Sequence, residues 1–89
     1  MSVAVNADAL TPAETILSGD EMYRLGLDAS LGTEGTEADL VIAHKWFNLA
    51  AMQGHLEART YRKELAMEMT TEQIAEAQRE AREYLTVRR

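Results

Sequence analysis

The chain has 89 residues, the size of one small domain, and no cysteine, which excludes disulfides, cysteine-based zinc sites and thiol catalysis. Its 15 acidic against 9 basic residues give a net charge of −6, which disfavours a general nucleic-acid binder because phosphate contacts need a basic face. No stretch approaches the roughly 20 apolar residues of a membrane span, and the N-terminal residues lack the pattern of a signal peptide. We therefore expect a cytoplasmic protein without membrane insertion.

The composition favours helices throughout. There is a single proline, and Ala, Leu, Glu, Arg and Met are abundant. β-Branched and aromatic residues never alternate over the length of a strand. The sequence therefore predicts an all-α fold of about four helices.

The N-terminal part offers two places where a helix can begin. Residues 1–10 show no periodicity, and we expect a tail there. Thr11, with Pro12 and Glu14 after it, is typical of a helix start, and Ser18 followed by Glu21 is a second capping box. Either one bent helix or two pieces would satisfy this pattern. The single helical domain is expected over residues 11–86.

The first long helix is predicted from Glu21 to about Leu31. Its apolar stripe consists of Met22, Leu25, Gly26, Ala29 and Leu31. Glycine inside a helix costs about 1 kcal/mol relative to alanine, and such a cost usually marks a close helix crossing. A loop over residues 32–37, which contains Gly32 and Gly35, should follow this helix.

The second helix is predicted over residues 38–53 and is apolar around more than half of its circumference, so neighbours should sandwich it. It carries the only tryptophan and the only phenylalanine, Trp46 and Phe47, followed by Ala50 and Ala51. We expect Trp46 in the core rather than in a ligand-stacking role. Gly54 should end this helix, because glycine takes the left-handed C-terminal conformation without steric cost.

Two further helices complete the expected domain. One should run from about Leu56 to Met69, with Ala58, Tyr61 and Leu65 on its apolar face. Thr70 and Gln73 form another capping box, and a helix over residues 71–85 should follow. Its narrow apolar stripe, which predicts a one-sided lid, consists of Ile74, Ala77, Ala81 and Leu85. Residues 87–89 should fray.

Residues 22–58 resemble one repeat of the Sel-one-like repeat family, relatives of the tetratricopeptide repeats. The matching residues are Tyr23, Leu25 and Gly26 in the first helix, Gly32 and Gly35 in the loop, and Trp46, Phe47, Ala50, Ala51, Gly54 and Ala58 thereafter. The second-helix part is the specific one. After Ala58 the pattern stops, because Tyr61-Arg62-Lys63-Glu64 stands where the next Tyr-x-Leu-Gly would begin. We therefore expect one repeat closed by a capping helix pair over residues 56–85.

The resemblance implies an α/α superhelical fold and a non-catalytic adaptor that binds another protein. The alternative is a structural accessory subunit held permanently in a larger complex. An adaptor should be a stable monomer, whereas an accessory subunit should fold poorly or self-associate when alone. Met52 and Met67 are candidates for an adaptable partner surface, although ordinary packing would also explain each methionine.

No residue pattern predicts catalysis, a metal or a cofactor. His44 and His55 are the only histidines and have no cysteine beside them, and Glu57 is the nearest carboxylate that could join a metal site. We expect His44 on the surface and His55 in a turn near a helix start. No pair of carboxylates is flanked by apolar residues that would raise a pKa, and no serine stands in a nucleophile motif. The sequence thus predicts no enzyme activity.

Overall fold

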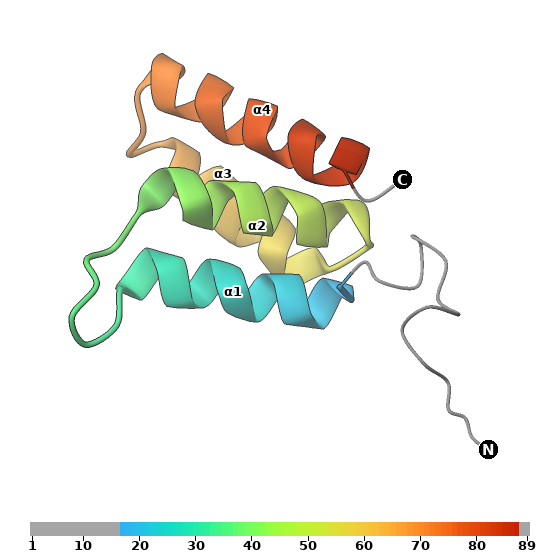
Figure 1. The fold of residues 1–89 in the computed structure, drawn as a ribbon, viewed down its shortest axis with the longest axis horizontal. Helices are drawn as coiled ribbons and strands as arrows, with labels where there is room; N and C mark the ends of the chain where they lie inside the picture. The colour runs from blue at the N-terminus through green and yellow to red at the C-terminus, as the bar shows by residue number, and fades with distance from the viewer. Residues whose placement is uncertain (1–16, 88–89) are drawn as a thin grey trace.

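The computed structural model describes residues 17–87, which form four α-helices and no strand (Figure 1). The helices are α1 (Gly19–Leu31), α2 (Leu40–Met52), α3 (Leu56–Ala66) and α4 (Thr71–Val87). These four helices confirm the all-α prediction. None of them is both long and apolar enough to cross a membrane. The expected tail, the Thr11–Glu14 helix start and the last two residues lie outside the described residues.

Helix α2 is the centre of the domain. It packs against each of the other three helices, whereas α3 and α4 lie mainly against α2 rather than against each other. Figure 1 shows α2 between α1 and α4, with α3 passing behind it. The expected sandwiching of this helix is confirmed. Its apolar surface extends around so much of the circumference that it can serve three neighbours at once.

The core combines a few large side chains with many alanines. Its largest fully buried side chains are Phe47, Met22 and Leu49. The buried alanines are Ala43, Ala50, Ala58, Ala77 and Ala81. Small residues on α2, α3 and α4 let the helix backbones come close, so that little apolar volume suffices to fill the space between them.

Gly26 marks the close crossing of α1 and α2 that the sequence predicts. A Cβ at this position would stand 2.5 Å from Cε1 of Phe47, a ring that is fully buried. No real side chain fits at that distance, so the ring of Phe47 occupies the space that glycine leaves. Gly26 on α1 and Phe47 on α2 therefore depend on each other, because the ring fills the space that a side chain at position 26 would need.

Side chains cap the helices as their sequences indicate. Ser18 and Glu21 form the capping box of α1, with the Glu21 amide donating to Ser18 Oγ at 3.1 Å and the Ser18 amide donating to Glu21 Oε1 at 2.8 Å. Thr70 and Gln73 form the equivalent box before α4. The hydrogen bonds from Ser18 lower the pKa of Glu21 below its usual value. These boxes position α1 and α4 by satisfying amides that have no partner within the helix.

Several predicted boundaries and the place of Leu31 on the apolar stripe are corrected. Helix α1 begins at Gly19 rather than Glu21, and α2 ends at Met52 rather than residue 53. Helix α2 begins at Leu40 rather than residue 38, because Asp39 is its cap and accepts from the Ile42 amide at 3.0 Å. Helix α3 ends at Ala66 rather than Met69, since i→i+3 hydrogen bonds tighten residues 67–69 into turns before the next capping box. Helix α4 continues to Val87. Leu31 is 80% exposed because it stands five residues beyond Gly26, about 140° around the helix.

Candidate functional site

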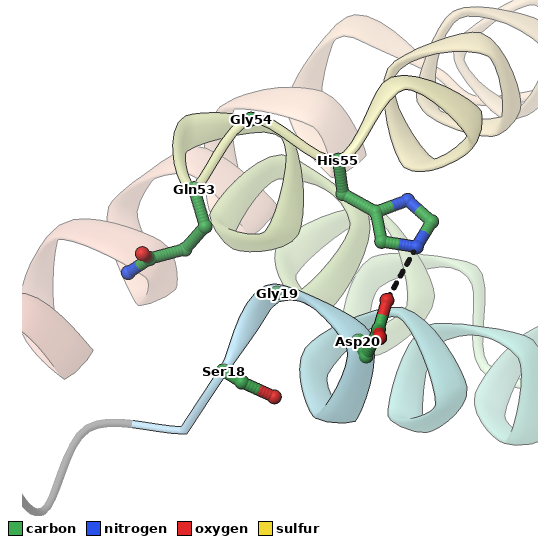
Figure 2. Close-up of a pocket in the computed structure, with 6 residues that line it drawn as sticks. All are labelled: Ser18, Gly19, Asp20, Gln53, Gly54 and His55. Atoms are coloured by element: carbon green, nitrogen blue, oxygen red, sulfur yellow. Dashed lines mark ion pairs between the residues drawn. The ribbon is translucent and has the colours of Figure 1, made fainter.

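A polar pocket of about 300 Å³ lies where the start of α1 meets the turn between α2 and α3 (Figure 2). It is lined by Ser18, Gly19, Asp20, Gln53, Gly54 and His55. Gly54 has a φ of +90°, which confirms its predicted role in ending α2. A Cβ on Gly19 would lie 3.2 Å from the Cβ of Gln53, so the start of α1 approaches this turn closely.

The polar side chains of this pocket hold helix ends together. His55 caps α3, since its Nδ1 accepts from the Ala58 amide at 3.1 Å. Its Nε2 lies 3.2 Å from Oδ1 of Asp20, the contact drawn in Figure 2. His55 therefore contacts two elements at once, the first turn of α3 through Nδ1 and Asp20 of α1 through Nε2. The prediction that His55 lies near a helix start is confirmed, and its contact to Asp20 ties α3 to α1.

An aromatic cluster extends from this pocket along α1 and α3. The ring of Tyr23 stacks on His55 with centroids 4.2 Å apart and lies 5.9 Å from the ring of Tyr61. Tyr61 also stacks on Phe47 at 5.5 Å. Burial, followed by the proximity of Tyr61 and Glu57, raises the pKa of Tyr23 above its usual value. Tyr61 nevertheless remains 43% exposed, so the cluster reaches the surface.

A second aromatic contact joins α2 to α4. The rings of Trp46 and Tyr84 meet edge-on at 5.2 Å, and Lys45 Nζ lies 4.5 Å from the centroid of Trp46. Trp46 is only partly buried, packed against the edge of the core, whereas its neighbour Phe47 is fully buried. The expectation that Trp46 would be a core residue is therefore corrected. Successive helical positions stand about 100° apart, so only one of the two rings can face the α1–α2 crossing.

His44 is the clearest departure from the sequence prediction. It is 3% exposed rather than on the surface, and its Nδ1 has no hydrogen-bond partner. Burial, followed by the charge of Arg62, lowers the pKa of His44. Arg62 itself donates to Oδ1 of Asn48 at 2.9 Å and so links α3 to α2. His44 is buried because the surface of α2 that carries it is covered by a neighbouring helix.

Helix α4 carries the one carboxylate pair with opposed pKa shifts among the described residues. Hydrogen bonding from Arg79 lowers the pKa of Glu76, whereas burial followed by the neighbouring Glu76 raises the pKa of Glu80. Arg79 also pairs with Glu83. Arg79 and Glu83 are exposed, so the group acts as a surface ion-pair network.

The residues of the predicted repeat motif take positions of three kinds. Gly26, Phe47, Ala50 and Ala58 are buried. Tyr23, Leu25, Trp46 and Ala51 are half-buried. Gly32, Gly35 and Gly54 have φ of +77°, +83° and +90°. The motif residues thus lie in the core and in the connections that follow α1 and α2. Tyr23 also belongs to the aromatic cluster.

The two candidate partner methionines are exposed. Met52 at the end of α2 is 61% exposed, and Met67 just after α3 is 83% exposed. The sequence alone predicted neither the contact between Asp20 and His55 nor the contact of the exposed Tyr61 with Tyr23. These residues are separated by 35 or more positions along the chain from their α1 partners, so no local spacing could indicate them. No group of three or more potential metal ligands gathers among residues 17–87.

Comparison of the chain with protein-family models, with curated proteins and with solved structures finds no match. Its function must therefore be argued from its own residues and their arrangement.

Proposed function

We propose that this protein is a non-catalytic adaptor, built on one Sel-one-like repeat, that binds another protein. In this proposal α1 and α2 are the repeat, and α3 and α4 are the pair that closes it. The packing of Gly26 on Phe47 and the left-handed Gly54 turn support it, because they give a structural reason for the most specific residues of the resemblance.

The observation that carries the proposal is the apolar surface left exposed on so small a domain. Leu31, Met52, Leu56 and Met67 are each more than 60% exposed. Exposed apolar side chains gain free energy when a partner covers them, at about 25 cal/mol per Å² of buried area. Methionine adapts to irregular partners because its side chain is flexible and polarisable.

The polar residues of the pocket argue against catalysis there. Ser18 Oγ is occupied by the Glu21 amide, and both nitrogens of His55 are engaged, one by the Ala58 amide and one by Asp20. The nitrogens of His55 face the Ala58 amide and Asp20 rather than Ser18, so His55 is not placed to activate this hydroxyl as a nucleophile.

The test is affinity capture of the full chain from its native cells, followed by identification of bound proteins by mass spectrometry. The parent should retain a partner that the tag alone does not. The double variant Met52→Ser/Met67→Ser should lose it, whereas the control Glu34→Gln in the exposed loop should keep it. Circular dichroism should show equal melting for all three. A parent that retains nothing beyond the tag would overturn the proposal.

The second candidate is a permanently bound accessory subunit. It is favoured by the distribution of the exposed apolar residues, because Leu31, Met52 and Leu56 come from three different helices. Analytical ultracentrifugation separates the two candidates. A stable monomer at micromolar concentration supports the adaptor, whereas self-association or a broad thermal transition supports the subunit.

A further inference from the structure

Helices α1 and α3 bring together two tyrosines, of which Tyr61 is exposed and Tyr23 half-buried, and three exposed carboxylates. We define the α1–α3 surface as Asp20, Tyr23, Glu57, Tyr61 and Glu64. Two contacts join its halves: the rings of Tyr23 and Tyr61 lie 5.9 Å apart, and Asp20 Oδ1 lies 3.2 Å from Nε2 of His55 at the start of α3. Glu57 and Glu64 stand four residues before and three residues after Tyr61, so all three share one side of α3.

The two glutamates of this surface, Glu57 and Glu64, lie away from the cations of their own helix. Arg62 is turned toward α2, where it donates to Asn48. Arg59 and Lys63 are exposed, but each stands two residues from Tyr61, and helical periodicity therefore puts both about 160° around α3 from it. On α1, the exposed Arg24 stands one turn after Asp20 on the same side of the helix, so the uncompensated charge of this surface is that of Glu57 and Glu64. Asp20 keeps 73% of its side chain exposed although it contacts His55.

The tyrosines supply ring surface between these charges. One side of the Tyr61 ring stacks on Phe47, yet 43% of the residue remains exposed. A guanidinium or ammonium group over such a ring is attracted by its electrons, and nearby carboxylates add charge-assisted hydrogen bonds. The exposed Leu31 further along α1 offers apolar contact to the same ligand. Phosphate-bearing partners are disfavoured here because the carboxylates repel them.

We propose that the α1–α3 surface docks a peptide segment of a partner protein that presents Arg or Lys side chains between apolar ones. The inference rests on the proposed adaptor function and names the chemistry of its partner. Charge complementarity selects this occupant: three carboxylates surround two tyrosine rings, and the cations of α3 lie on its other sides.

The test measures binding of a fluorescein-labelled amphipathic peptide of Arg, Lys and Leu to the full chain by fluorescence anisotropy. A matched peptide carries Glu in place of Arg and Lys. The basic peptide should bind, and the acidic one should not. The variant Glu57→Gln/Glu64→Gln should weaken binding about five- to tenfold at low salt, because it removes two exposed charge pairs. Raising the salt concentration should narrow the difference between parent and variant.

The control Glu34→Gln/Glu37→Gln removes the same charge from the exposed loop between α1 and α2 and should change binding less than about twofold. Circular dichroism melts should be equal for all variants, since no hydrogen bond of Glu57 or Glu64 is lost. The inference is overturned if the loop variant weakens binding as much, if both peptides bind alike, or if the basic peptide does not bind. If a cellular partner is lost on Met52→Ser/Met67→Ser but retained on Glu57→Gln/Glu64→Gln, the adaptor function stands and the α1–α3 surface is not its binding site.

Discussion

Among the described glycines, Gly26 makes the closest approach to a neighbouring side chain, the ring of Phe47. The new Cβ of Gly26→Ala would meet a ring carbon at 2.5 Å, and the ring is fully enclosed. Although alanine raises helix propensity, we expect the variant to lose about 1–3 kcal/mol of unfolding free energy through overpacking. Urea denaturation followed by circular dichroism measures this loss.

The variant Phe47→Leu provides the control, because a smaller side chain leaves room for the new methyl group. Gly26→Ala/Phe47→Leu should be more stable than the sum of the single losses predicts, which is the signature of two residues in contact. Additive losses, or a Gly26→Ala variant that melts higher than the parent, would contradict the close-crossing interpretation.

A second prediction at the residue scale concerns pH and His44. Burial, followed by the charge of Arg62, lowers the pKa of His44 below its usual value of about 6.5, so the unfolded chain binds a proton more readily than the folded one. The contribution of His44 is complete above pH 6.5 and is lost as the pH falls, by at most about 1.4 kcal/mol per pH unit. Urea denaturation at pH 7.5, 6.5 and 5.5 should show this decline.

The variant His44→Leu should flatten that pH dependence, because it removes the buried imidazole. His55→Asn is the matched control: it removes the other histidine while asparagine still caps α3. The control should retain the slope between pH 7.5 and 5.5. A flat profile for the parent, or a slope abolished by His55→Asn instead, would show that His44 does not titrate differently on folding.

At the scale of the element, each helix start depends on a few polar atoms. Thr70 Oγ1 accepts from the Gln73 amide at 3.0 Å, and Gln73 Oε1 accepts from the Thr70 amide at 2.9 Å. Thr70→Ala should therefore cost about 1 kcal/mol, the usual value of a lost N-cap. Thermal melting of Thr71→Ala serves as control, since Thr71 is exposed and lies inside the helix. Equal losses from both substitutions would contradict the capping role.

The helix boundaries show how far the sequence determines these elements. The boxes at Ser18 and Thr70 were predictable because each lies within four consecutive residues. The end of α3 was not, because the apolar spacing continues to Met69 while the backbone tightens into turns. The start of α2 at Leu40 depends on Asp39, whose side chain accepts from the Ile42 amide, rather than on the apolar pattern, which already begins at Ala38.

At the scale of the whole molecule, the sequence pattern predicted which helices form. It did not predict which face of each helix packs against which neighbour. The all-α class and a close helix crossing at Gly26 followed from composition and one glycine, whereas Phe47 as the residue opposite Gly26 is seen only in the structure. The burial of His44 and the partial exposure of Trp46 did not, because both depend on where α3 and α4 settle against α2. For the same reason the α1–α3 surface, which joins residues about 35 positions apart, could be found only in the folded chain.

The arrangement around α2 predicts unequal stability across the domain. Helix α4 packs mainly on α2, and its contact stripe consists of buried Ala77 and Ala81 with half-buried Ile74 and Leu85. Two methyl groups and two partly buried side chains contribute only a few kcal/mol at about 25 cal/mol per Å², whereas each ordered residue costs about 1–2 kcal/mol of backbone entropy. Helix α4 should therefore open before the rest of the domain.

Hydrogen exchange of the intact protein followed by NMR measures this directly. Amides of residues 74–84 should exchange faster than those of residues 43–51, which lie in the helix contacted by all three others. The variant Ala81→Gly, which weakens α4 and its contact, should accelerate exchange in α4 while leaving α2 nearly unchanged. Equal protection in both stretches, or equal acceleration in both, would mean that the four helices unfold as one cooperative unit and that α4 belongs to the core rather than covering it as a lid.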